Sequence, residues 1–344
     1  MSASNNPDPD DPFEWILDNY FDTNSKATKE AVEDILYDGD VALNPWLEDR
    51  GITAYEVTTE DAKAYFKDLK RAYEPSVQQE YATRVEFIYG KFLSYNVEGI
   101  DINPFERVSD NHDILDENHP EQTPIYDKQT IQDVLFRLHP CYFVITLTML
   151  KTTRRIGGTV NLNLCDCHLD HPAANWELDR HVRDYPDHIY YSPKPTEGED
   201  FRGETRDSSS KTVTHTIIPL DDELKDALIW WIMMRRADQK QGPLFTKPTP
   251  REEGLRVTDG EYRWRLEQVT DDLGYRFGGH DPGNIKPHYW RHWSTSIMRD
   301  RVKKSIVDYF RGDKGNTGDG YDHYTPEKRQ VWIDNIPKFL NNRN

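Results

Sequence analysis

The sequence has little of what marks a secreted, membrane-bound or disulfide-stabilised protein. Only three of its 344 residues are cysteines, which is too few for a disulfide framework. The longest apolar run, residues 141–150, is too short to span about 30 Å of hydrocarbon. The N-terminus also has no basic, apolar signal pattern. We therefore expect a soluble, cytoplasmic protein that has no membrane partner.

Signatures of nucleotide and metal binding are scarce as well. Glycine-rich phosphate loops of the GxGxxG or GKS/T type are absent. The run Cys165-Asp166-Cys167-His168 has two interpretations, zinc ligands or ordinary loop residues. No second Cys/His pair follows at a zinc-like spacing. We favour the loop, and we expect neither a metal nor a cofactor.

Positive charge is in short supply. The chain has 43 Lys and Arg against 61 Asp and Glu, a net charge of −18. Nucleic-acid binding usually needs a basic surface, so one interpretation is an acidic protein without such a partner. The other is a protein from a salt-in halophile, because the Debye length falls to about 3 Å at 1 M salt and distant acidic residues then hardly repel phosphate. Net charge alone does not decide between them.

Composition divides the chain into two domains. Residues 1–12 are polar and acidic, which predicts a disordered tail. Residues 13–108 have a helical pattern, and the apolar positions of residues 77–92 repeat at helical spacing. Residues 109–123 have almost no core-forming side chains and are predicted to be a linker. Residues 124–344 then form the second domain.

The second domain is predicted to combine helices with a small antiparallel β-sheet. Apolar spacing in residues 131–138 favours a helix. Residues 188–192 and 212–220 are rich in β-branched and aromatic side chains, which favours two strands joined by a long polar loop. Asp221 or Asp222 would cap the helix that follows. The fold class is therefore mostly α with a small antiparallel sheet.

A set of cations in this domain is more informative than any single motif. Arg155 follows the apolar run, Lys211 precedes the second strand, and His288 and Arg291 are three apart on one predicted helix face. Each has an ordinary structural explanation when taken singly. Arg155 suits a helix C-terminus, and Lys211 suits a solvated strand edge. Their order along the chain is what suggests a shared function.

That order resembles the tyrosine recombinase (phage integrase, Xer-like) family over residues 124–344. Arg155 falls on the first arginine of the family's Thr-Gly-Leu-Arg-Ile-Ser-Glu type motif, which reads TTRRIGG here. Lys211 matches the lysine of the family's β-hairpin, with Lys194 as a competitor for that role. His288 and Arg291 match the family's His-x-x-Arg box.

The resemblance also supplies a nucleophile. Tyr321, in the run Tyr321-Asp322-His323, matches the family's tyrosine, and Tyr324 is the alternative. Two positions depart from the pattern. Gly158 stands where the family has an acidic residue, and Asp313 stands where it has His or Trp. Both departures bear on catalytic efficiency and not on the fold.

The resemblance implies a helical, SAM-like core-binding domain at residues 13–108 and a mixed α/β catalytic domain. It implies site-specific recombination, in which double-stranded DNA with inverted half-sites is cleaved and rejoined through a 3′-phosphotyrosine. The arginines, His288 and the residue at Asp313 would contact the phosphate, and Lys211 would be the general acid. The implied assembly is a homotetramer, to which accessory DNA-bending proteins are a candidate addition. The alternatives are a catalytically weakened DNA-binding protein and a topoisomerase of type IB.

The end of the chain leaves one question open. Residues 327–339 carry a short apolar set that includes Trp332 and Ile336. In the family a terminal helix often docks on a neighbouring protomer. The same side chains could equally fold back on their own domain.

Overall fold

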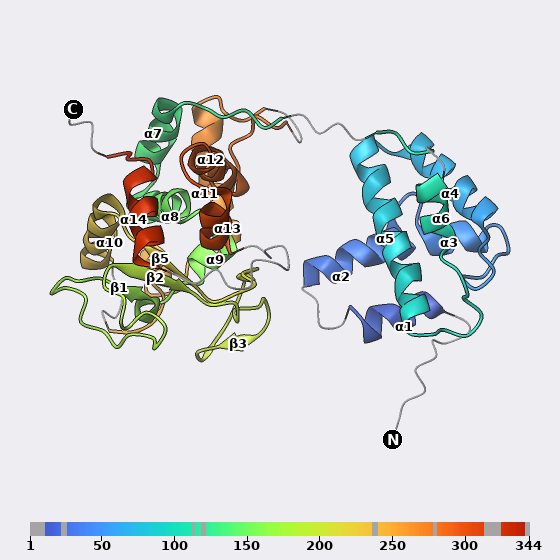
Figure 1. Ribbon diagram of the computed structural model, residues 1–344, viewed down its shortest axis with the longest axis horizontal. Coiled ribbons are helices and arrows are strands. Elements are labelled where there is room, and N and C mark those ends of the chain that lie inside the picture. Colours follow the sequence, from blue (N-terminus) through green and yellow to red (C-terminus); the bar gives the residue numbers. More distant parts are fainter. Residues whose placement is uncertain are drawn as a thin grey trace, which may run out of the picture. The chain divides into compact units, whose positions relative to one another are not determined.

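The chain divides into two compact units, residues 1–121 and 122–344 (Figure 1). The structure is a computed structural model that describes residues 11–21, 26–111, 114–117, 122–235, 240–277, 281–312 and 325–340. Each unit has its own hydrophobic core. Among these described residues, no helix is long and apolar enough to cross a membrane.

The first unit is helical throughout its described residues. Its elements are α1 (Pro12–Asn19), α2 (Lys26–Glu33), the π-helical turn η1 (Asp34–Asp38), α3 (Leu43–Glu48), α4 (Thr59–Ala72), α5 (Pro75–Ser94) and α6 (Pro104–Asn111). Thr58 and Asp61 form a capping box that starts α4. The predicted stripe lies on α5, whose Val85, Ile88 and Phe92 are fully buried.

Both ends of the first unit differ from the sequence prediction. Asp11 and Pro12 belong to α1 and not to a tail, because the Asp11 carboxylate accepts hydrogen bonds from the first backbone N–H groups of the helix. At the other end, α6 continues past residue 108. Ile114 and Leu115 pack against the core, and Asp116 forms an ion pair with Lys70. The predicted linker of residues 109–123 therefore belongs in part to the folded unit.

The second unit combines helices with two small sheets. Its elements are α7 (Lys128–Arg137), α8 (Pro140–Thr152), α9 (Ile156–Val160), the 3-10 turn η2 (Leu164–Asp166), β1 (Cys167–His168), β2 (His188–Tyr191), β3 (Asp200–Phe201), β4 (Glu204–Thr205), β5 (Thr216–Pro219), α10 (Asp222–Met234), the 3-10 turn η3 (Pro250–Glu252), α11 (Asp259–Asp272), α12 (Pro287–Arg299), α13 (Lys304–Arg311) and α14 (Pro326–Asn335).

The main sheet has the order β1-β2-β5, and both of its pairings are antiparallel. Tyr191 is opposite Thr216 in this register. The strand predicted at residues 212–220 is shorter than expected. It begins only at Thr216, because its partner β2 ends at Tyr191, the residue opposite. Asp221 caps α10 by accepting the N–H of Leu224.

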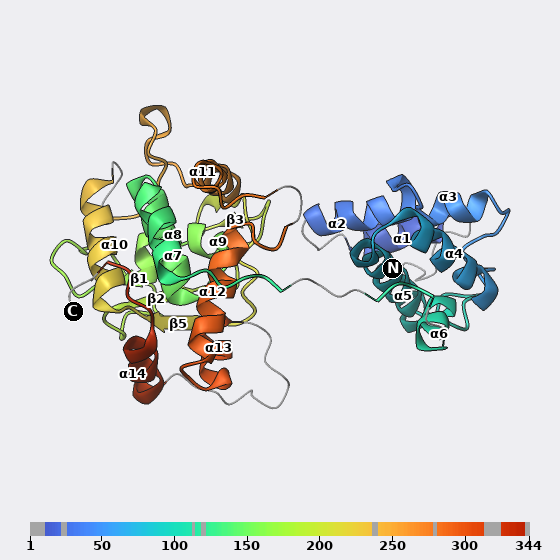
Figure 2. The same cartoon turned by 90° about the horizontal axis from the view of Figure 1, so that it is seen from above.

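Helix α8 is the centre of the second unit. It packs against α7, α9, α10, α11 and α12, which Figure 2 shows from above. Nearly every side chain from Cys141 to Thr152 is buried, and that explains the near-continuous apolar run in this part of the sequence. The only buried cation of the helix, Lys151, is neutralised by Asp221 at 2.7 Å and Glu223 at 2.5 Å.

The end of the chain folds back on its own unit. Trp332 of α14 and Phe339 are fully buried in the core of the second unit. The Glu223 carboxylate accepts the N–H of Phe339 at 2.8 Å, and Lys151 donates to the carbonyl oxygen of Pro337. Of the two placements that the sequence left open, the structure has the one within the same protomer.

Charge is divided unequally between the two units. Residues 1–121 contain 10 Lys and Arg against 28 Asp and Glu, a net charge of −18. Residues 122–344 contain 33 of each kind, and their net charge is zero. The entire net charge of the chain therefore belongs to the first unit.

Candidate active site

The site begins where α8 ends. Thr153 has a φ of +56°, a left-handed conformation that turns the chain out of the helix. Arg154 is buried, with its guanidinium 4.8 Å from the centre of the Tyr191 ring. Arg155 is extended and directly precedes α9, and its side chain is partly exposed. The turn thus sends one arginine into the core and leaves the next accessible.

Helix α12 brings the His-x-x-Arg pair to the same place. Pro287 occupies its first turn, where its missing N–H costs nothing. Arg291 is 1% exposed, and its Nη1 donates to the carbonyl oxygens of Thr153 at 2.7 Å and Arg311 at 3.0 Å. These two bonds join the ends of α8 and α13 to the middle of α12. They fix the guanidinium beside the turn that carries Arg155.

The electrostatics of His288 show how closely the cations gather. The pKa of His288 lies below its usual range, first because of desolvation and then because of nearby positive charge. The four largest charge effects come from Arg155, Arg291, His292 and Arg311. Cations that repel one another in this way are stabilised by a bound anion. A phosphate group would be a favourable common partner for these cations.

Two members of this cluster were missed in the sequence. His292 directly follows Arg291 on α12, and Arg311 ends α13. The only signal was adjacency to a matched motif, since Arg311 stands just before Gly312 in the run that departs from the family pattern. Its carbonyl oxygen holds Arg291, while its charge acts on His288.

Lys211 reaches the site through residues 208–213, here named the lysine segment. Lys211 is exposed, while Ser208, Ser210 and Thr212 around it are buried. On one side the segment lies against Gly157 and Gly158 of α9. On the other side the N–H of Val213 makes a long, 3.5 Å hydrogen bond to the carbonyl of Gly312. The lysine segment therefore runs between the helix that follows Arg155 and the end of α13.

The competitor Lys194 lies in the loop between β2 and β3. It is exposed, and its charge contributes to the lowered pKa of His215, after desolvation and the charge of His181. Of the two lysines, Lys211 is the one whose backbone neighbours contact the arginine-bearing elements.

The departure at Gly158 has a structural counterpart. A Cβ atom there would lie 3.5 Å from the carbonyl oxygen of Ser210 and 3.7 Å from its Oγ. The space into which an acidic side chain would extend is therefore occupied by the lysine segment. The other departure, Asp313, lies outside the described residues, as do Tyr321 and Tyr324. The residues that border this stretch are Gly312, which ends α13, and Thr325, which caps α14.

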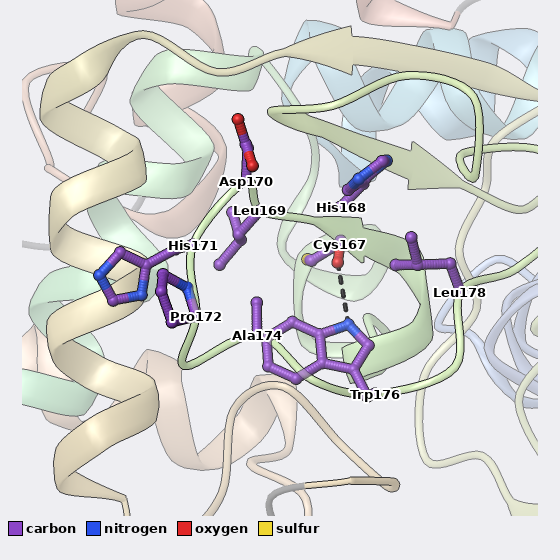
Figure 3. A pocket seen from close by; sticks show the side chains of 9 residues that line it. All are labelled: Cys167, His168, Leu169, Asp170, His171, Pro172, Ala174, Trp176 and Leu178. Carbon is purple, nitrogen blue, oxygen red and sulfur yellow. Dashed lines mark hydrogen bonds between the residues drawn. The ribbon is translucent and has the colours of Figure 1, made fainter.

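The cysteine-containing run has structural partners of its own. The Sγ of Cys165 accepts a hydrogen bond from Arg202, and the carbonyl of the buried Cys167 accepts one from Trp176. An open hollow of about 390 Å³ adjoins them, and in Figure 3 the side chains of His168 and His171 point away from each other. Within the described ranges, no group of three or more His, Cys, Asp or Glu is placed to hold a metal ion.

Comparisons with known proteins agree with this architecture. Neither the protein-family models nor the curated proteins give a match. Solved structures do. The integrase of transposon Tn1549, in complex with a circular intermediate DNA, superposes with a TM-score of 0.60 at 18% identity, covering 94% of this chain and 97% of that one. A lambda integrase dimer bound to a COC′ core site gives 0.53 at 12% identity, covering 91% and 99%.

The chain has the tyrosine recombinase fold. A lambda integrase tetramer bound to a Holliday junction shares this fold too, with a TM-score of 0.54 at 13% identity over 88% of this chain and 77% of that one. The predicted class, mostly α with a small antiparallel sheet, is confirmed. Within the tyrosine recombinase fold, Arg155, His288 and Arg291 come together, and the lysine segment adjoins them.

Proposed function

We propose that this chain is a site-specific DNA recombinase, an enzyme that cleaves and rejoins duplex DNA through a 3′-phosphotyrosine. The observation that carries the proposal is the convergence on His288 of cations from the end of α8, from α12 and from α13. Several cations gathered at one place in an acidic chain suit the binding of an anion. The fold, shared with integrases solved on DNA, makes a backbone phosphate the best candidate.

In the proposed reaction each residue has one role. Arg155 and Arg291 hold the non-bridging oxygens of the scissile phosphate, since guanidinium groups offer paired donors and keep their charge. His288 adds a third donor. The Tyr321 hydroxyl loses its proton to solvent as its oxygen attacks phosphorus, forming the Oη–P bond while the bond from phosphorus to the 5′-oxygen breaks. Lys211 gives a proton to that oxygen. The reverse attack by a 5′-hydroxyl rejoins DNA without ATP.

The proposed partners follow from this reaction and from the neighbours. The substrate is double-stranded DNA with inverted half-sites, acted on by a homotetramer in the cytoplasm, with accessory DNA-bending proteins as further candidates. A lambda integrase solved as a tetramer on a Holliday junction supports the fourfold assembly. The acidic first unit supports an origin in a salt-rich cytoplasm, because a net charge of −18 would repel DNA in dilute buffer.

A suicide substrate tests the proposal. Nicked DNA that loses its 5′-hydroxyl strand after cleavage would trap the covalent adduct at high KCl. We expect an adduct with the wild-type chain and with Tyr324→Phe, and none with Tyr321→Phe, while both variants keep their DNA affinity. The reverse pattern assigns the nucleophile to Tyr324.

The same assay separates the alternatives. Adducts without sequence preference, together with relaxation of supercoiled DNA, would favour a topoisomerase. Binding without any adduct would favour the DNA-binding protein, the alternative that Gly158 suggests.

A further inference from the structure

The contact between α9 and the lysine segment is unusually close. At Gly157 a Cβ atom would fall within 3.0 Å of the carbonyl oxygen of Ser209, a separation that real side chains do not reach. Only glycine allows this approach of helix to backbone. At Gly158 the corresponding Cβ would be in ordinary contact with Ser210, at 3.5 Å. The first glycine is therefore required by the contact, and the second is merely adjacent to it.

Polar contacts hold the segment in the same position. The Nδ2 of Asn161, the residue that caps the end of α9, donates to the carbonyl of Ser208 at 2.6 Å. The N–H of Ser210 donates to the carbonyl of Pro195 at 2.8 Å, and its hydroxyl donates to the carbonyl of Ser192 at 3.0 Å. These three bonds come from two different parts of the unit. The backbone just before Lys211 is thus fixed from both sides.

Lys211 itself carries the strain of this arrangement. Its φ of +49° is a left-handed conformation that is unfavourable for a residue other than glycine. Immediately after it, Thr212 Oγ1 lies 2.8 Å from Ser210 Oγ, and this contact between the two hydroxyl groups closes the turn around the lysine. Such strain persists where the surrounding structure over-determines it, and that is common at functional sites.

We propose that Gly157 and Asn161 are positioning residues that set the Lys211 ammonium against the leaving 5′-oxygen. The proposal rests on the proposed function, in which Lys211 is the general acid. In this proposal α9 connects the two functions. It begins directly after the phosphate-binding Arg155, and it also holds the segment that carries the proton donor Lys211. The proposal also explains why Gly158 stands where the family has an acidic residue, because the lysine segment fills the space that a longer side chain would need.

The chemistry of the leaving group provides a selective test. A DNA substrate with sulfur in place of the bridging 5′-oxygen leaves as a thiolate, whose conjugate acid has a pKa of about 8.5, so it needs no proton donor. We compare Gly157→Ala with its matched control Gly158→Ala in single-turnover cleavage of oxygen and sulfur substrates. General acids contribute about 10²- to 10⁴-fold. Gly157→Ala should lose about 100-fold or more with oxygen and less than 10-fold with sulfur.

Gly158→Ala should stay within about 3-fold of the wild type on both substrates, because its new methyl group meets Ser210 at an ordinary contact distance. Equal losses of Gly157→Ala on the two substrates would overturn the inference, since the phosphate-binding cations would then be what moved. Unchanged cleavage of the oxygen substrate would overturn it as well. If Gly157→Ala does not fold, Asn161→Ala removes one hydrogen bond and should show the same selective, smaller loss.

Hydrogen exchange tests the contact between Gly157 and the lysine segment independently of activity. The N–H of Ser210 is bonded in the wild type, and Gly157→Ala should speed its exchange at least 10-fold while peptides from α10 keep their protection. An unchanged exchange rate at Ser210 would show that Gly157 does not hold the lysine segment in place. A wild-type chain that forms no adduct with either substrate would instead overturn the proposed function, and the general-acid role of Lys211 with it.

Discussion

The Nη1 atom of Arg291 lies 2.7 Å from the carbonyl oxygen of Thr153, a residue 138 positions earlier in the chain. This bond links the arginine of the His-x-x-Arg pair to the turn that presents Arg155. It also separates two arginines that the sequence treats alike. Arg291 is buried and joins two backbone carbonyls that are far apart in the chain, whereas the side chain of Arg155 is partly exposed.

Alanine substitutions should therefore separate activity from stability. Arg155→Ala and Arg291→Ala should each lower cleavage by 100-fold or more, since one preorganised donor is worth roughly 3–4 kcal/mol. Arg291→Ala should also lower the free energy of unfolding by about 2–4 kcal/mol, because two buried carbonyls lose a charged donor. Arg155→Ala should lower it by less than Arg291→Ala does, because the side chain of Arg155 is partly exposed. Urea denaturation measures both, and equal stability losses would contradict the distinction.

The turn at Thr153 predicts a stabilising substitution. A β-branched residue at a φ of +56° is strained, and the buried Oγ1 of Thr153 has no hydrogen-bond partner among the described residues. Thr153→Gly should raise the free energy of unfolding by about 1 kcal/mol, since the left-handed conformation costs glycine little. Thr153→Ala, which removes the hydroxyl but keeps the strain, is the control. A loss of stability in the glycine variant would count against this account.

The lowered pKa of His288 predicts pH-dependent DNA binding. Without DNA, the pKa of His288 lies below the usual value of about 6.5, because of desolvation and the surrounding cations. A bound phosphate offsets those cations and raises the pKa again, so binding takes up a proton within this window. Affinity should fall as pH rises through the window, by at most tenfold per pH unit. Fluorescence anisotropy between pH 5 and 8 measures it.

His288→Gln should flatten this pH profile. The control is His139→Gln, because the pKa of His139 is lowered by burial and by Arg265 on a different part of the second unit. It should leave the profile unchanged. A profile that flattens equally in both variants would show that the proton is not taken up at His288.

The unequal charge of the two units predicts an unusual salt dependence. Proteins that neutralise phosphates lose DNA affinity steeply as salt rises. Here a first unit of net charge −18 repels DNA, and salt screens that repulsion. Affinity should fall little, or rise, between 0.1 and 1 M KCl. Replacing the exposed Glu74, Glu80 and Glu98 with Gln should strengthen binding mainly at low salt. A steep, ordinary decline in the wild type would refute this prediction.

The buried Lys151 predicts how firmly the end of the chain is held. Lys151→Met leaves the carboxylates of Asp221 and Glu223 buried without their cation and should cost about 3–5 kcal/mol of unfolding free energy. Lys338→Ala, at a half-exposed partner of Asp221, should cost less than about 1 kcal/mol. Hydrogen exchange at Phe339 should accelerate only in the Lys151 variant. Similar behaviour of the two variants would contradict this account.

Local pattern was sufficient for much of the architecture. The apolar spacing of residues 77–92 predicts α5, and β-branched residues near 188–192 predict β2, because burial on one face imposes these periods directly on the sequence. Period alone did not place the start of β5, since that strand begins opposite the end of its partner β2, at the pair of Tyr191 and Thr216. Likewise, two apolar residues in a polar run did not reveal that Ile114 and Leu115 pack on the first unit.

By itself, the sequence determined the fold class and the order of Arg155, Lys211, His288 and Arg291, because helix period and short motifs are written in neighbouring residues. Only the tertiary structure decided that Arg311 and His292 join them, that the end of the chain docks on its own unit, and that Gly157 seats the lysine segment. Each of these depends on contacts between residues far apart in the chain. Such contacts leave no periodic pattern in the sequence, since they depend on the size and charge of residues that are close only in the folded chain.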